Sequence, residues 1–138
     1  MATLTELLAP HGITAADEIL AGIEVPVLTG VQRQGDVLIV PRKPLTKAER
    51  SQTVEVPAEG VAVVVGEATG NTHILSADGL VLFGRRGAGL LIGVVEVPAG
   101  SVGHLIHTDE HGANSIGPGC FELRGKQEQA DVVRRVAD

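Results

Sequence analysis

Two polar segments that carry histidine are the places where side chains able to do chemistry gather in this chain. The first runs from Gly66 to His73, and the second is Asp109-Glu110-His111-Gly112. Both are set between valine-rich stretches of a chain that contains two Phe and no Trp or Tyr. Imidazole nitrogens and carboxylate oxygens that converge from two loops suit a divalent transition metal such as zinc, iron or manganese.

A metal site built this way would need both segments at the same end of a sheet. Its candidate ligands are two imidazoles, a possible third imidazole and two carboxylates: His73, His111, His107, Glu67 and Glu110. The other interpretation is that the imidazoles hydrogen-bond to the backbone of the turns and hold the loops in place. We favour this second interpretation, which requires no cofactor, and keep the metal site as the alternative.

Other kinds of active site lack one of their required parts. Ser76, Ser101 and Ser115 lie in apparent turns and outside the Gly-x-Ser-x-Gly frame of a strand-to-helix elbow. Cys120 has no adjacent base and lies in an apparent strand, which is typical of a small buried residue. The segment Gly84–Gly89 lacks the Lys-Ser/Thr pair and the following helix of a phosphate-binding loop. We therefore expect no enzymatic activity.

Charge and composition exclude further classes of partner. The 138 residues carry a net charge of −6, whereas nucleic-acid and anionic-membrane binding depend on basic surfaces. The near absence of aromatic residues also removes the stacking platforms of single-strand binders. There is no apolar run long enough for a transmembrane helix and no secretory leader pattern, so we expect the cytoplasm of a cell or infected host, or a virion.

Short β-branched runs bounded by Gly, Pro and charged residues predict an all-β domain. These runs are Val25–Thr29, Asp36–Val40, Thr53–Val56, Val61–Val65, Thr72–Leu75, Leu80–Phe83, Leu90–Val97, Val102–Ile106 and Cys120–Leu123. The Asp78-Gly79 pair predicts a tight hairpin, and Lys43–Arg50 an exposed loop. Because no helix-length amphipathic segment separates the runs, we expect a small antiparallel β-sandwich or barrel.

The sequence divides into a helical N-terminal arm (1–24), a β-domain (25–125) and a charged tail (126–138). Thr3 and Glu6 have the spacing of a capping box, and so do Thr14 and Asp17 with Asp in place of Glu. Each predicted helix is too short to be stable alone, so the arm must dock on the β-domain or on a partner. Val132, Val133 and Val136 could follow one helical face, but an exposed tail that partly docks is our expectation.

Five short motifs follow one another along the chain from residue 31 onward: Gln34–Leu38, Gly66–His73, Asp109–His111, Pro118-Gly119 and Arg134–Asp138. They resemble a family of small, uncharacterised β-rich proteins encoded by bacteria and phages. In that family the two histidine segments carry additional histidines, which implies a metal site. This chain has Asn71 and Thr108 at those positions, and a shift of one residue along a strand would turn His107 to the opposite face.

The loss of two family histidines favours a scaffolding role, because scaffolds tolerate such losses better than metal sites do. We expect a non-catalytic protein that self-associates or docks on a larger protein array, for example as a decoration protein on a phage capsid. The predicted partner-binding residues are on the arm and in one basic loop: Leu4, Leu7, Leu8, Ile19, Leu20, Arg85 and Arg86. Such a protein would most simply be a homo-oligomer.

Overall fold

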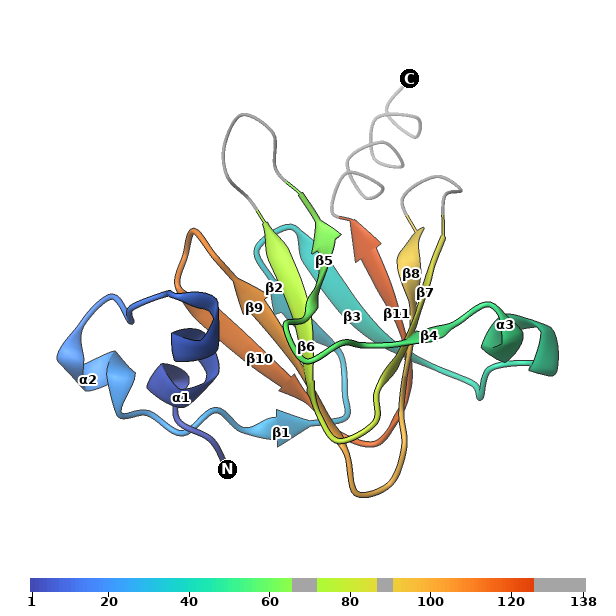
Figure 1. The fold of residues 1–138 in the computed structure, drawn as a ribbon, viewed down its shortest axis with the longest axis horizontal. Coiled ribbons are helices and arrows are strands. Elements are labelled where there is room, and N and C mark those ends of the chain that lie inside the picture. The colour runs from blue at the N-terminus through green and yellow to red at the C-terminus, as the bar shows by residue number, and fades with distance from the viewer. Residues whose placement is uncertain (66–71, 87–90, 126–138) are drawn as a thin grey trace.

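The computed structural model describes residues 1–65, 72–86 and 91–125 and contains two β-sheets with a short helical arm beside them (Figure 1). The first sheet has the order β1 (Val27–Leu28), β10 (Gly112–Ile116), β9 (Val102–His107), β6 (His73–Asp78) and β5 (Val61–Val64). The second has the order β2 (Gln32–Gln34), β3 (Val37–Arg42), β11 (Gly119–Gly125), β8 (Leu91–Val97), β7 (Leu82–Arg85) and β4 (Val54–Glu55). Neighbouring strands are antiparallel except for β1 and β10, which confirms a small β-sandwich.

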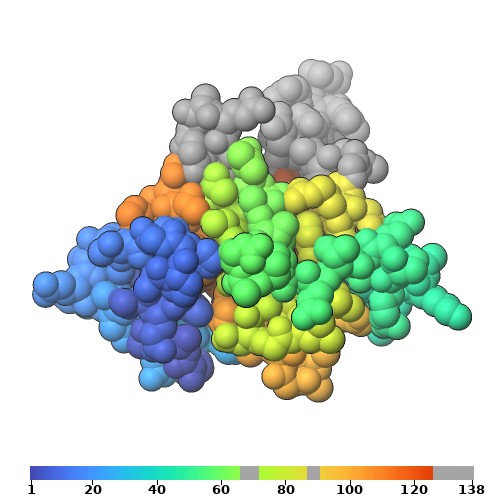
Figure 2. Space-filling model, viewed as in Figure 1, coloured from blue at the N-terminus to red at the C-terminus, as the bar shows by residue number. Residues whose placement is uncertain are grey.

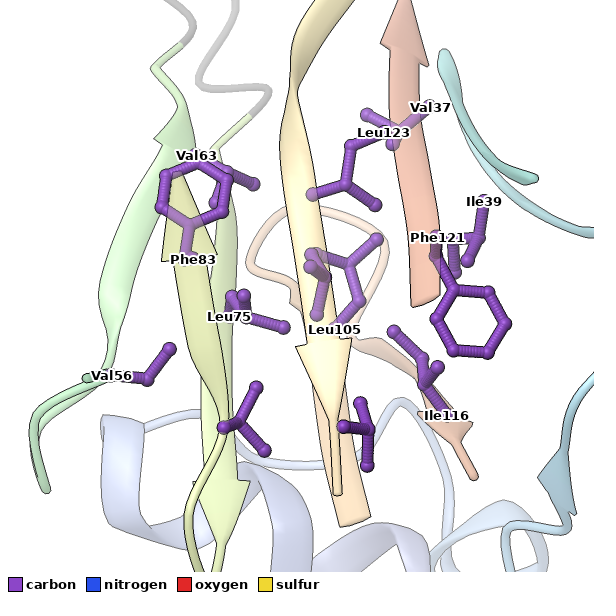
Figure 3. Packing of buried hydrophobic residues seen from close by; sticks show 13 residues of the cluster. Val37, Ile39, Val56, Val63, Leu75, Phe83, Leu105, Ile116, Phe121 and Leu123 are labelled. Atoms are coloured by element: carbon purple, nitrogen blue, oxygen red, sulfur yellow. The ribbon is translucent and has the colours of Figure 1, made fainter. Parts of the chain in front are cut away.

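The main core lies between the two sheets and is filled by branched aliphatic side chains and both phenylalanines (Figure 3). Phe121 and Leu123 alternate with partly exposed neighbours along β11, as expected for a strand with one buried face. Leu75 of β6 and Leu105 of β9 meet them from the other sheet and are fully buried. The valine-rich runs of the sequence therefore form one shared interior.

The arm is built from α1 (Leu4–Leu8), the 3-10 helix η1 (Ala9–His11) and α2 (Glu18–Ala21). The first predicted capping box is confirmed, since the Thr3 hydroxyl accepts from the Glu6 N–H and the Glu6 carboxylate accepts from the Thr3 N–H. The second is wrong, because Asp17 itself caps α2 by accepting from the Leu20 N–H at 2.7 Å. An aspartate oxygen is a strong N-cap acceptor, so α2 begins later than the sequence pattern suggested.

A second hydrophobic cluster fixes the arm to the outer face of the first sheet. Leu7 and Leu8 of α1 pack with Val25 and with Ile106 of β9. A backbone bridge between Thr3 and Glu24 closes the arm on itself. The arm is thus docked on its own β-domain, which is one of the two possibilities that its short helices required.

The Asp78-Gly79 turn exists, but the predicted hairpin does not. Gly79 has a φ of +87°, as such a turn requires, yet β6 belongs to the first sheet and β7 to the second. The turn carries the chain across the sandwich, where the Leu80 N–H donates to the Ser101 hydroxyl at 3.0 Å. Turn chemistry specifies the reversal of the chain, but the choice of pairing partner depends on which sheet buries the following strand.

Several further elements depart from the sequence predictions. The Lys43–Arg50 segment, predicted as a loop, leads into a helix, α3 (Lys47–Ser51), with a capping box between Thr46 and Glu49. The strands β2 and β10 were not predicted, because they are rich in polar residues and lack the alternation of apolar and polar residues that indicates a strand. The tail from residue 126, and the Val132, Val133 and Val136 pattern within it, lie outside the described residues. In the described ranges, no helix is long and apolar enough to cross a membrane.

Candidate functional site

The most unusual feature of the interior is a pair of buried, stacked imidazoles. His73 of β6 and His107 of β9 are directly opposite each other in the strand register. Their ring centroids are 4.2 Å apart with an angle of 6° between the ring planes, and the residues are only 1% and 2% exposed. His107 therefore faces the same interior as His73, which corrects the expectation that its side chain would point away.

A network of buried amides fixes the orientation of His73. The Gln34 side chain of β2 donates through Nε2 to the Leu105 carbonyl at 2.6 Å and to Asn114 Oδ1 at 3.0 Å. Gln34 Oε1 is thereby turned to His73 Nδ1, 2.8 Å away, so this ring nitrogen carries the proton and donates. Asn114 in turn donates to Gln32 Oε1 at 3.0 Å.

His107 is buried without comparable partners. Neither of its ring nitrogens has a hydrogen-bond partner among the described residues. Glu110 Oε2 lies 3.4 Å from His107 Nδ1, close enough for an ion pair with a protonated ring but outside hydrogen-bond geometry. The turn between β2 and β3 covers the pair at Gly35, where a Cβ would lie 3.2 Å from His107 Cε1. A buried imidazole left in this state loses hydrogen bonds that it would make in water.

The surroundings of His73 favour its neutral form. Burial lowers the pKa of His73 from 6.5 to about 4, with repulsion from His107 as the second cause. Asp36 and Glu110 act in the opposite direction on the same pKa but do not outweigh these effects. Two cationic rings cannot share this stack without a large electrostatic cost, so at least one imidazole is neutral near pH 7.

The other predicted metal ligands are placed differently from the pair. His111 lies in the turn before β10 with a φ of +54°, and its Nδ1 donates to the Thr14 carbonyl of the arm. Its ring thus joins the β-domain to the arm and not to the backbone of its own turn. Glu67 lies outside the described residues. Within the described part of the chain, no three His, Cys, Asp or Glu side chains are grouped to hold a metal.

A second histidine chain crosses the outer face of the first sheet. His104 Nε2 donates to Asp78 Oδ2 at 2.8 Å, and the Ser115 hydroxyl donates to His104 Nδ1 at 2.8 Å. Ser115, His104 and Asp78 have the residue types of a catalytic triad, but the ring nitrogens are exchanged, with Nδ1 facing the serine and Nε2 facing the aspartate. Ser115 is only 1% exposed, however, so its hydroxyl is not open to a substrate. The arrangement joins the neighbouring strands β6, β9 and β10.

The predicted basic loop is engaged within the chain. Arg85 donates to the carbonyls of Ala62 and Val63 at 2.7 and 3.2 Å, and its guanidinium lies 5.4 Å from the centre of the Phe83 ring. Arg86 lies 3.9 Å from a carboxylate oxygen of Glu49. These contacts join β7 to β5 and to α3, so both guanidinium groups already have intramolecular partners.

The arm presents an exposed apolar surface, although not with all the predicted residues. Leu7 and Leu8 are 8% and 0% exposed and pack inside the chain, which removes them from any partner-binding surface of the docked arm. Ile19, Leu20 and Ile23 are 82%, 41% and 49% exposed. α2 lies at the outer end of the arm (Figure 1), and the arm forms a lobe beside the β-domain (Figure 2).

A shallow apolar groove of about 250 Å³ lies between the arm and β10. It is lined by Leu4, Leu20, Ile23, Glu24, Val25, Pro26, Gly112 and Ala113. Exposed side chains continue along the chain at Val27, Leu28 and Val31. The sequence pointed to Leu4, Leu20 and Ile19, whereas the contribution of Ile23 and of β1 became visible only when the arm was folded. We call residues Leu4, Ile19, Leu20, Ile23, Val27 and Leu28 the arm surface.

Comparison with known proteins places most of this chain in a family without assigning a function. The sequence model of a domain of unknown function (DUF8820) matches residues 33–126, which include both sheets except β1 and the start of β2. No curated protein and no solved structure matches the chain. The match leaves out the arm, as did the resemblance noted in the sequence. The chain belongs to the DUF8820 family, whose function is unknown.

Proposed function

We propose that this protein is a non-catalytic assembly protein that docks on a larger protein array through the arm surface. The observation that carries this proposal is the run of exposed aliphatic side chains between Ile19 and Leu28, on a segment firmly attached to a rigid sandwich. A phage capsid that the protein would decorate is one such array. Contiguous exposed apolar surface of this kind marks interaction sites in soluble proteins.

The way the arm is attached supports a binding role for it. The Leu8 anchor and the hydrogen bond from His111 to the Thr14 carbonyl hold the arm on the β-domain before any partner arrives. A preformed surface loses little conformational entropy on binding, so more of the energy of apolar burial remains as affinity. Each square ångström of apolar area removed from water contributes roughly 25 cal/mol.

Replacing Ile19 and Ile23 together with serine tests this proposal. Both side chains are exposed, so the double variant should fold normally while losing the apolar contacts of the arm surface. We expect binding to the native partner, isolated by co-purification and then measured with purified components, to weaken by about tenfold or more.

The matched control is the Val54→Ser, Val65→Ser double variant, which removes two aliphatic side chains that are each 66% exposed away from the arm. It should bind as the wild type does. Equal binding by all three proteins would refute docking through the arm surface.

A second candidate function, metal binding, is favoured by one observation: the buried nitrogens of His107 have no hydrogen-bond partner in the described part of the chain. His73 already donates its Nδ1–H to the side-chain oxygen of Gln34, and metal-bound histidines commonly make a hydrogen bond of this kind through their second nitrogen. Glu110 lies beside His107. The His73 and His107 rings are parallel, so the lone pairs of their nitrogens do not converge on one point. At least one ring would have to rotate before both could bind the same ion. Zinc or another divalent transition metal would suit such a donor set.

Elemental analysis of protein purified without chelators tests the metal site. If the site exists, one transition metal per chain should be present in the wild type and lost in His73→Ala and in His107→Ala. The His111→Ala variant serves as the control, because that ring is tied to the arm and should leave the metal in place. A wild-type protein free of metal after incubation with zinc would exclude this function.

A further inference from the structure

The groove beside the arm has the size of an anchor site for a side chain. Its volume of about 250 Å³ is below the range of roughly 300–1,000 Å³ typical of sites that enclose small-molecule ligands. Leu4, Leu20 and Ile23 line it together with Val25 and Pro26, so its walls are aliphatic. A single aliphatic side chain of a partner could insert here while its neighbours contact the exposed Ile19.

The charged side chains of the arm, which forms one wall of this groove, all have one sign. Residues 1–32 contain no Lys or Arg, and they contain four carboxylates: Glu6, Asp17, Glu18 and Glu24. Glu24 lines the groove itself, and Asp17 and Glu18 directly precede Ile19. Burial lowers the pKa of His11, the one histidine of the arm, so this ring adds no positive charge near pH 7. The groove is therefore apolar at its centre and negative at its rim.

This charge distribution discriminates between two occupants. A symmetric dimer through the arm would bring the same acidic patch of two copies together, because a two-fold contact pairs each surface with itself. Like charges facing each other oppose such a contact, whereas basic groups on another protein would be attracted and oriented by them. The favoured occupant is thus a different protein.

We propose that the arm groove binds a segment of another protein in which an exposed aliphatic side chain is flanked by Lys or Arg residues. This inference rests on the proposed docking function and adds the chemistry of the partner. The aliphatic group fills the space between Leu20 and Ile23, and the flanking cations face Glu18 and Glu24. The acidic rim supplies orientation and a fast encounter, while the apolar groove supplies most of the contact area.

The proposal is tested with the full chain and two fluorescently labelled peptides. Both peptides have a central leucine, which is flanked by lysines in one and by glutamates in the other. We expect fluorescence anisotropy at low salt to show binding of the lysine peptide at least about tenfold tighter than that of the glutamate peptide. Raising the salt concentration should weaken the binding of the lysine peptide, because the charges at the rim are exposed.

The Glu18→Lys, Glu24→Lys variant should abolish or reverse this preference. The matched Glu55→Lys, Glu59→Lys variant changes two exposed acids on another part of the surface and should preserve it. Equal binding of both peptides, lost in Ile23→Ser, would overturn the inference about charge and leave docking intact. Self-association in sedimentation that Ile23→Ser abolishes, with no peptide bound, would identify a second copy as the occupant and overturn the inference. A protein that neither binds either peptide nor self-associates would overturn the inference and the proposed function together.

Discussion

The Leu8→Ala variant is expected to lose about 2–5 kcal/mol of unfolding free energy, the cost of emptying a fully buried aliphatic site. Leu8 is 0% exposed and packs with Leu7, Val25 and Ile106 between the arm and the outer face of the first sheet. Alanine retains the helical propensity of α1, so the loss reports packing and not helix formation. Urea denaturation, followed by circular dichroism, gives the free energy directly.

The appropriate comparison is Ile19→Ala, which shortens an aliphatic side chain on the same arm at a position that is 82% exposed. Its effect on stability should stay within about 0.5 kcal/mol, as for most surface substitutions. In binding to a partner the order should be reversed, with Ile19→Ala the more damaging change under conditions where both proteins are folded. If Leu8→Ala proved as mild as Ile19→Ala, the arm would not be anchored as described.

Anchoring of the arm also changes how its function can be tested. Deletion of residues 1–22 would expose Ile106 and Val25 to water in addition to removing the part of the arm surface that lies on α1 and α2. We therefore expect the deletion to destabilise the β-domain, so a loss of binding in that variant would not by itself locate the interface. Point substitutions at exposed positions of α2 separate the two effects.

The second large effect is a loss of stability in mild acid caused by His73. Its pKa in the folded protein is lowered to about 4, below the ordinary 6.5, because the folded state favours the neutral ring. Between these two values the unfolded chain binds a proton that the folded chain does not, so stability falls as the pH falls. The full stability is present above about pH 6.5, and the loss amounts to on the order of 3 kcal/mol by the time the pH reaches about 4.

A His73→Gln variant isolates this effect from the titration of other groups. Glutamine is neutral at every pH, so the variant should be less stable than the wild type at pH 7 and should lose less stability on acidification. Unfolding free energies measured with urea between pH 7 and pH 4, in the presence of a chelator, provide the comparison. Parallel pH profiles for the two proteins would show that His73 is not the responsible group.

Together, the two features divide the molecule into parts of different character. The stacked histidines and the amides of Gln34 and Asn114 lie within the DUF8820 match, whereas the whole arm surface precedes it. The buried pair affects stability and supplies the donors for the alternative metal function. The arm surface supplies the docking function that we propose, and the acids beside it are the basis for the class of partner that we infer.

The sequence by itself determined the elements that depend on neighbouring residues. The Thr3 and Glu6 capping box needs only one helical turn, and the β-branched runs report a pleated, half-buried strand wherever they occur. These local patterns were sufficient to predict the all-β class and a helical arm that must dock on another surface. They also showed where histidines gather, since residue type is read directly from the chain.

Only the tertiary structure decided which of these pieces meet. His73 and His107 are brought face to face by the register of β6 against β9, and Asp78-Gly79 leads from one sheet to the other instead of closing a hairpin. Leu8 and Ile19 are both aliphatic residues of the arm, yet one is buried and the other exposed. Pairing, register and burial depend on contacts between residues far apart in the chain, and a local pattern contains no information about which distant surface will cover it.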